Sequence, residues 1–423
     1  MNTLKSASHS KYKYSIVIPT RDRFQYLSSC VDTAFEFGRD NDTEVVVSVN
    51  GTVDDYNIAL KFLGFRTRLA NVRIICTNST LSMIESFDFA LRQATGRYIT
   101  SLGDDDAVMF CYRDKVDAHF DAHPSSILTW YRSAYYWNDT PAPGLLAGCT
   151  WDDPKKIIIK EKLEEIRSRS VSYNDLPNIY NSFIPKKLLD YVRNKNLIFS
   201  GSDSIYPSAD CCAPDIFSGI QNIYYLKGEY WLARAPVTIS CISARSNGLA
   251  AQSKNASNNE AMLFNRENKM DSFETMTEKY LIKTNSVQMY NAAIQVFAHK
   301  HFSKICSLPS WVPTRLWLMN LIDAYISCEA REYPEYASSF VELQSIFDLN
   351  YKTDLLEAIE RSSLVIDPTK SLSPSIYCKN HYSFKNFKND PGYSPTNRIS
   401  LEHSGCINSF QAVLYYEAIY ENA

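Results

Sequence analysis

Three consecutive carboxylates, Asp104, Asp105 and Asp106, are the residues of this sequence whose types and spacing best suit chemistry. They follow the apolar segment 98–102 and Gly103. Adjacent carboxylates at the end of a strand repel one another unless a cation neutralises them. Oxygen ligands suit Mg²⁺ or Mn²⁺, which keep bound waters and are shared with substrate phosphates. The run therefore indicates a metal-bound diphosphate and a nucleotide-dependent transfer, with a solvated acidic turn as the alternative.

The elements that must position these carboxylates alternate between strands and helices. Short β-branched, apolar segments predict strands at 14–20, 44–49, 72–76 and 98–102, and helical spacing predicts helices at 24–37, 54–65 and 83–94. This alternation is typical of a mainly parallel α/β sheet, in which ligands bind beyond the carboxyl ends of the strands. Polar or turn residues follow three of the strands, at 19–23, 50–52 and 103–106. We expect these three strand ends to converge on one crevice.

Beyond residue 110 the pattern is mixed, and then helical. We expect helices at 112–123, 161–169 and 185–193 and strands at 126–136 and 231–242. A Ser- and Asn-rich stretch at 252–259 is typical of a linker. Helical periodicity dominates after it, and residues 371–400 are predicted to be an extended loop. The sequence therefore predicts a mostly helical C-terminal domain at 251–423.

The amino-acid composition limits the classes of protein to which this chain can belong. A chain of 423 residues with 45% hydrophobic residues can bury the cores of two or three domains. The net charge of −3 offers no basic surface for nucleic acid. The 11 cysteines are scattered, with no CxxC pair, and are expected to be buried thiols.

The same reasoning predicts a compartment. The first 14 residues lack the apolar segment of a signal peptide, and no apolar run reaches the roughly 18 residues of a membrane span. We therefore expect a cytoplasmic protein. The tryptophan-rich segment 308–319 leaves open a peripheral contact with the inner face of the membrane, although packing on the catalytic domain explains it as well.

An ordered set of motifs resembles a known family. The segments SIVIPTRDR, EVVVSVNGTVDD and SMIESFDFALRQATGRYITSLGDDD are followed by YNSFIPKKLL, APDIFSGI and PVTISCISARSNG. Together they resemble the inverting family 2 glycosyltransferases with the GT-A fold, of the bacterial surface-polysaccharide type. The resemblance covers about residues 12–250. It implies a GT-A domain at 1–250, with a nucleotide-binding half at 12–110 and an acceptor half at 111–250.

The resemblance also implies the donor site. Asp105 would be the direct metal ligand, with Asp104 nearer the ribose and diphosphate and Asp106 either ligating or supporting. Gly103 stands where many members have the first Asp of their DxD motif, and Asn50 stands where an aspartate usually reads the base. The expected nucleotide-sugar contacts are Pro19, Thr20, Arg21, Arg23, Asn50, Ser82, Asp104, Arg245 and Ser246.

Asp215 occupies the position of the family's catalytic base, with Asp210 and Asp203 as nearby alternatives. An inverting transfer needs a carboxylate to take the acceptor hydroxyl's proton as that oxygen attacks C1. A carboxylate favoured only by the helix dipole at a helix start is the simpler interpretation of Asp215. Arg245 and Ser246 lie on a loop that could close over the diphosphate.

These expectations describe a hexosyltransferase that uses Mn²⁺ or Mg²⁺. It would move sugar from a nucleoside diphosphate to a saccharide hydroxyl, on an acceptor that could be lipid-linked, during O-antigen or capsule synthesis. One alternative is a sugar nucleotidyltransferase, which the glycine-free loop 19–23 disfavours. Another is a non-catalytic saccharide-binding scaffold, which Gly103 and Asn50 keep open. A homo-oligomer also stays open.

Two histidines one helical turn apart, His119 and His123, have the spacing of a zinc pair. No third ligand with suitable spacing accompanies them. Histidines in the last turn of a helix also interact favourably with the helix dipole, and we favour that interpretation.

Overall fold

The computed structural model describes residues 11–38, 41–131, 134–138, 145–147, 151–158, 161, 177, 179–194, 229–243, 398–400 and 406–420. The helices are α1 (Phe24–Phe37), α2 (Val53–Leu63), α3 (Met83–Arg92), α4 (Arg113–Ala122), α6 (Lys186–Asn194) and α17 (Ser409–Tyr420), with 3₁₀ turns η1 (Gly64–Arg68) and η2 (Phe110–Tyr112). The strands are β1 (Tyr14–Thr20), β2 (Thr43–Val49), β3 (Val72–Cys76), β4 (Tyr98–Ser101), β5 (Ala107–Val108), β6 (Leu128–Trp130), β7 (Ala134–Tyr136), β8 (Leu145–Ala147), β9 (Lys155–Ile158), β10 (Ser182–Pro185), β11 (Glu229–Ala233), β12 (Thr238–Ile242) and β13 (Arg398–Ser400).

An eight-stranded sheet in the order β3-β2-β1-β4-β10-β6-β11-β9 forms the centre of the described region. Its first four strands are parallel, whereas β10 runs antiparallel to both β4 and β6. The predicted strands and helices up to residue 101 are confirmed, with ends that differ by one or two residues. The sheet flanked by helices is the GT-A-like architecture expected from the motifs.

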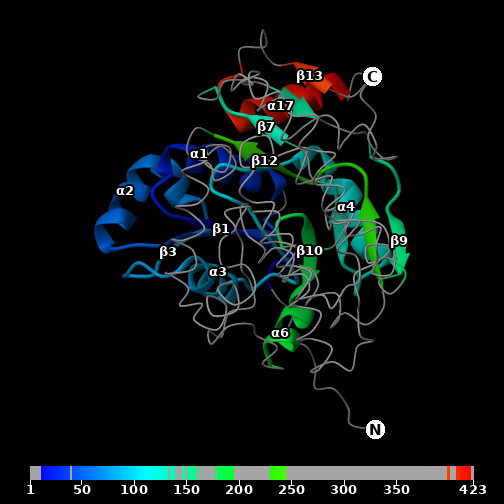
Figure 1. Cartoon of the computed structure of the whole chain (residues 1–423), viewed down its shortest axis with the longest axis horizontal. Helices are drawn as coiled ribbons and strands as arrows, with labels where there is room; N and C mark the ends of the chain where they lie inside the picture. Colours follow the sequence, from blue (N-terminus) through cyan, green and yellow to red (C-terminus); the bar gives the residue numbers. More distant parts are fainter. Residues whose placement is uncertain are drawn as a thin grey trace, which may run out of the picture.

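Helices cover both faces of this sheet, because its central strands are apolar at successive positions. Ile16 and Ile18 of β1 belong to the core formed with α1, α2 and α4. Val17, between them, belongs to a second core formed with α3 and α6. In Figure 1, α1, α2 and α4 accordingly lie on one side of the sheet and α3 and α6 on the other. Burial on both faces explains the uninterrupted apolar strands.

Two predicted strands are each divided between two sheets, so the prediction of continuous strands is wrong. Segment 126–136 forms β6 in the main sheet and β7 in a second sheet, ordered β13-β8-β7-β12-β5. Segment 231–242 likewise forms β11 in the main sheet and β12 in the second. Pro236 lies between β11 and β12, where it cannot donate to a ladder, so the chain changes sheet there.

The end of the chain returns to the N-terminal domain. Strand β13 pairs antiparallel with β8, and α17 lies against α1 and β5 (Figure 1). Residues 398–400 are thus a strand, where the sequence predicted an extended loop. Segment 244–397 lies outside the described residues, so the division into domains at residue 250 stays a prediction. Among the residues described, no helix has the length and apolar character needed to cross a bilayer.

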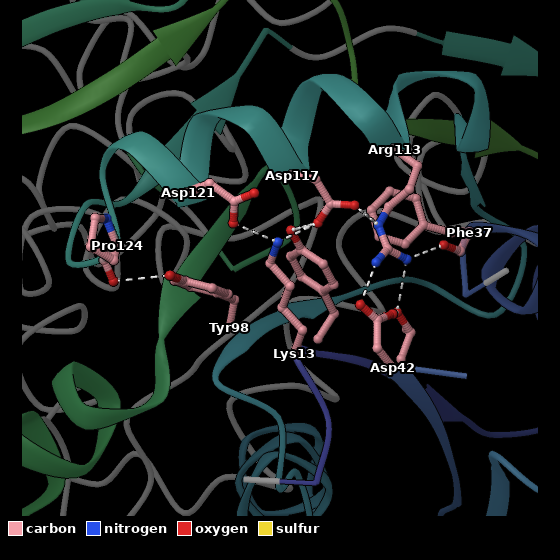
Figure 2. Close-up of polar contacts among 10 residues, drawn as sticks. Lys13, Phe37, Asp42, Tyr98, Arg113, Asp117, Asp121 and Pro124 are labelled. Carbon is pink, nitrogen blue, oxygen red and sulfur yellow. Dashed lines mark hydrogen bonds and ion pairs between the residues drawn. The ribbon is translucent and has the colours of Figure 1, made fainter. Parts of the chain in front are cut away.

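A buried cation holds α4 against the first strand (Figure 2). The guanidinium of Arg113 lies 4.7 Å from the ring centre of Tyr14 and donates to Asp42, to Asp117 and to the carbonyl of Phe37. Burial alone would raise the pKa of the Asp117 carboxyl, but hydrogen bonds from Lys13, Tyr14 and Arg113 lower it. These contacts fix α4, and with it the segment 107–112 that follows the acidic run.

Candidate donor site

The structure brings together the ends of β1, β2 and β4, as the α/β pattern predicts. The backbone N–H of Asn50 donates to the carbonyl of Thr20 over 2.9 Å. The hydroxyl of Thr20 donates to Asp104 Oδ2 over 2.7 Å. These bonds tie the acidic run to the loop after β1, and that loop to the end of β2.

Asp104 and Asp105 are buried and share one cation. Their side chains are 1% and 5% exposed, and Arg23 approaches Asp104 Oδ1 at 2.5 Å and Asp105 Oδ2 at 3.2 Å. Among the described residues, Asp104 Oδ1 accepts no hydrogen bond, and Arg23 is its ion-pair partner. Burial raises the pKa of the Asp104 carboxyl, an effect that Arg23 and Thr20 oppose. The buried Asp104 carboxylate therefore favours a positively charged group beside it.

The side chain of Asp106 hydrogen-bonds to backbone N–H groups. Its Oδ2 accepts from the N–H of Gly103 over 2.9 Å, and its Oδ1 accepts from the N–H of Cys241 over 2.8 Å. Asp106 thus joins the acidic turn to β12. A Cβ added at Gly103 would lie 2.8 Å from Asp106 Oδ2 and 3.2 Å from Asp105 Oδ1. This close approach explains why glycine occupies the position where the family motif often begins with aspartate.

The side chains of the site can be compared with the ligands that a divalent cation prefers. Asp104 and Asp105 supply the carboxylate oxygens that Mg²⁺ and Mn²⁺ prefer. A buried oxygen of Asp104 already lies against the positively charged guanidinium of Arg23. Within the described ranges, no group of three or more His, Cys, Asp or Glu side chains is arranged to hold a metal. The residues therefore fit a cation bound by two carboxylates and completed by water or substrate oxygens. The resemblance left Asp106 either ligating or supporting, and its two oxygens accept from the backbone N–H groups of Gly103 and Cys241.

Two residues that the sequence analysis missed support Asp105. The hydroxyl of Ser243 donates to Asp105 Oδ2 over 2.9 Å, and the indole N–H of Trp137 donates to the carbonyl oxygen of Asp105 over 3.0 Å. Ser243 lies in the motif PVTISCISARSNG, so that motif was an available signal. No nearby sequence pattern identifies Trp137 as a site residue. It follows β7, and the position of β7 in the second sheet places Trp137 beside Asp105.

Asn50 and Ser82 hold the loop between β3 and α3. Asn50 Nδ2 donates to the carbonyl of Leu81 over 3.0 Å, and Asn50 Oδ1 accepts from the Leu81 N–H over 2.8 Å. An aspartate could not make the first of these bonds, because an ionised carboxylate only accepts. Ser82 caps α3 in a reciprocal pairing with Glu85. Both predicted nucleotide contacts therefore also have a structural task.

Of the other predicted site residues, some lie within the described part of the chain and some lie outside it. Pro19 is buried in β1, paired in register with Ser48. Arg21 lies 3.7 Å from Asp22, and its backbone N–H bonds to Asp104. Five predicted site residues lie outside the described residues: Asp203, Asp210, Asp215, Arg245 and Ser246.

The histidine pair lies on α4, away from the acidic run. His119 Nε2 lies 2.9 Å from the hydroxyl of Ser126, and the ring of His123 stacks on Trp231 at 4.1 Å. The described part of the chain brings no third metal ligand to this pair.

Comparison with known proteins identifies the region that carries this site. Residues 15–170 match the sequence model of glycosyl transferase family 2. This region is a family 2 glycosyltransferase domain. The chain is accordingly a glycosyltransferase with a GT-A-like fold, and the acidic turn, Arg23 and Asn50 all lie within the matched part of the glycosyltransferase.

Solved structures of glycosyltransferases match the chain at low identity and low TM-score. S. aureus TarS 1-349 in complex with UDP-GlcNAc is 14% identical with a TM-score of 0.43, over 84% of each chain. The mannosyltransferase PcManGT from Pyrobaculum calidifontis, in complex with GDP-Man and Mn²⁺, is 13% identical with a TM-score of 0.36, over 86% of this chain and 91% of that one. No curated protein matches the chain. The family assignment rests on the sequence match.

Proposed function

We propose that this glycosyltransferase is metal-dependent and inverting, and that it moves a hexose from a nucleoside diphosphate to a saccharide hydroxyl. One observation carries the proposal. Two buried carboxylates, Asp104 and Asp105, lie where the ends of β1, β2 and β4 meet inside a family 2 domain. In open α/β sheets this edge is where ligands bind.

Asp104 and Asp105 would hold Mn²⁺ or Mg²⁺, and the loops after β1 and β2 would hold the nucleotide. A bound divalent cation stabilises the charge that develops on a departing diphosphate. Thr20 and Ser243 orient the two carboxylates through hydrogen bonds of 2.7 and 2.9 Å. The chain's own part in donor binding is therefore to fix two oxygen ligands in a buried position.

The transfer step would take place between donor and acceptor. The acceptor oxygen bonds to C1 of the sugar as the bond from C1 to the diphosphate oxygen breaks, and its proton passes to a carboxylate. We propose Asp215 for this base, with Asp210 and Asp203 as the alternatives. Attack opposite the leaving group inverts the anomeric configuration.

We also propose a role in assembling a bacterial surface polysaccharide, such as O-antigen or capsule. This part of the proposal follows the motif resemblance, whereas the proposed cytoplasmic location follows from the sequence features given above. TarS, to which the chain is similar, was solved with UDP-GlcNAc and PcManGT with GDP-Man. We accordingly propose a nucleoside diphosphate sugar as the donor and leave the base to experiment.

Thermal unfolding of the full chain with Mn²⁺ and each of UDP, GDP, dTDP and CDP tests donor binding. A ligand that binds only the native state raises the melting temperature by mass action. We expect one nucleotide to do so in the presence of Mn²⁺ and not in EDTA. The rise should disappear in Asp105→Asn and persist in Asp190→Asn, which changes a surface pair with Lys186. No rise with any nucleotide at millimolar concentration would favour the non-catalytic scaffold.

The identified nucleotide then allows a test of stereochemistry. Proton NMR of the sugar released from the corresponding donor should show the opposite anomeric configuration at the earliest time points. Retention of configuration would contradict an inverting mechanism. Loss of transfer in Asp215→Asn, with nucleotide binding unchanged, is expected for the base.

A further inference from the structure

Arg23 occupies a position where local helix physics disfavours a cation. It is the N-cap residue of α1, and its side chain makes no capping hydrogen bond. N-caps favour Ser, Thr, Asp and Asn, and the positive end of the helix dipole repels a guanidinium. The compensation comes from outside the helix, through the ion pairs with Asp104 and Asp105.

Among the described residues, two carboxylates share one cation at this site. Asp104 and Asp105 are almost fully buried, whereas the Arg23 guanidinium that pairs with both is 23% exposed. Thr20 and Ser243 each donate a neutral hydrogen bond to the two carboxylates. Within the described part of the chain, the ion pairs of this acidic turn thus set one positive side chain against two carboxylates, where the proposed metal would bind.

The carboxylate oxygens that a metal would need are the ones that Arg23 contacts. Asp104 Oδ1, which accepts no hydrogen bond within the described ranges, lies 2.5 Å from one terminal nitrogen of the guanidinium. Asp105 Oδ2 lies 3.2 Å from the other. A divalent cation held by these carboxylates would take oxygen ligands that now contact the guanidinium. Arg23 and the metal would therefore compete for Asp104 and Asp105.

We propose that Arg23 is a built-in counter-ion that holds Asp104 and Asp105 until a divalent cation displaces it. The inference rests on the proposed metal site. The displaced guanidinium remains attached to the loop after β1, beside the proposed diphosphate position, where its planar fork suits phosphate oxygens. Arg23 would then weaken metal binding to the free enzyme and position the donor once the metal is bound.

Calorimetric titration of the full, nucleotide-free chain with Mg²⁺ alone tests this competition. We expect Arg23→Gln to bind Mg²⁺ at least tenfold more tightly than the unmodified chain. Arg92→Gln is the matched control, because it removes the same charge from a side chain on α3 that pairs with Asp88, away from the acidic turn. We expect its Mg²⁺ affinity to stay within twofold of the unmodified chain.

Tryptophan fluorescence gives a second readout of the same displacement. The indole of Trp137 donates to the backbone of Asp105, so it should respond when the carboxylate changes partner. We expect a Mg²⁺-dependent change in the unmodified chain that Trp137→Phe removes.

Arg23→Gln could fail to fold because it leaves two buried carboxylates without a cation. Arg23→Lys then decides the question, since it keeps the positive charge but lacks the planar fork of the guanidinium, and Mg²⁺ affinity should rise about threefold. Equal affinity in the unmodified chain, Arg23→Gln and Arg23→Lys would overturn the inference, as would an equal rise in Arg92→Gln.

The two proposals fail in different ways. Absence of Mg²⁺ binding in every variant overturns the competition and the metal site together. If Mg²⁺ binds the unmodified chain and Arg23→Gln equally, only the competition fails. Donor binding that needs Mn²⁺ in that case leaves the proposed function intact.

Discussion

The hydroxyl groups of Tyr112 and Tyr416 lie 2.7 Å apart in the interior, although 304 positions separate them in the chain. Tyr112 belongs to η2, which follows the acidic run and β5, and Tyr416 belongs to α17. Ser29 and Ser409 form a second buried contact between hydroxyls, at 3.1 Å. Helix α17 is therefore part of the core that supports the donor site.

The contact predicts that the end of the chain stabilises the glycosyltransferase domain. Tyr416→Phe removes one hydrogen bond and should cost about 1 kcal/mol in the free energy of unfolding. Tyr416→Ala also removes a buried ring and should cost about 3–5 kcal/mol. The control is Tyr415→Ala, because Tyr415 is 38% exposed, and its effect should stay within about 0.5 kcal/mol. Denaturant unfolding measures all three, and equal losses for Tyr415→Ala and Tyr416→Ala would contradict the assigned packing.

Introducing an aspartate at position 103 is predicted to lower the stability of the fold. Gly103→Ala places a Cβ against Asp105 and Asp106, which should cost about 1–3 kcal/mol. Gly103→Asp adds a fourth carboxylate to a site that holds one nearby cation and should cost more. Melting temperatures of both variants, compared with the unmodified chain, measure the difference. A Gly103→Asp protein as stable as the unmodified chain would show that the turn can open.

Asp105 and Asp106 are predicted to have separable roles. Asp106→Asn deprives one backbone N–H, of Gly103 or Cys241, of its acceptor and should lower stability by about 1–3 kcal/mol. The folded Asp106→Asn protein should keep Mn²⁺-dependent donor hydrolysis. Asp105→Asn should keep most of its stability and lose hydrolysis. Rates measured per folded molecule, beside melting temperatures, distinguish this pattern from one in which both variants lose hydrolysis equally.

Asn50→Asp is predicted to loosen the loop that precedes α3. The carboxylate cannot donate to the Leu81 carbonyl and would face it at the present 3.0 Å, at a cost of about 1–3 kcal/mol. The melting temperature should therefore fall in the absence of any nucleotide. An unchanged melting temperature with altered nucleotide preference would instead assign Asn50 to the base alone.

His119 predicts a loss of stability in mild acid. Burial, with a smaller contribution from His123, lowers the pKa of His119 from 6.5 to about 4. The unfolded chain therefore binds more protons than the folded one between these values. The stability that neutral His119 contributes is complete above pH 6.5 and is lost as the pH falls toward 4.

Melting temperatures at pH 7.5 and pH 5 test this dependence. Acidification should lower the melting temperature of the unmodified chain by a few degrees more than that of His119→Gln, which cannot take up the proton. The same decrease in both proteins would mean that other groups account for the acid sensitivity.

Much of the fold and part of the site follow from local sequence. Segments 14–20 and 44–49 could be predicted as strands because β-branched, apolar runs of that length suit a buried sheet. The meeting of Thr20, Asn50 and Asp104 followed as well, since the carboxyl ends of parallel strands share one edge.

Tertiary packing decided the rest. The split of 126–136 and 231–242 between two sheets depends on which neighbours each strand meets, and hydrophobic periodicity is the same in either sheet. The partners of Arg23, Asp106 and Asn50 come from other segments, so residue type alone could not assign them. The sequence by itself thus determined the elements and the edge where chemistry is placed. Only the folded chain decided which carboxylates face a cation, because burial and long-range hydrogen bonds choose among side chains that are alike in sequence.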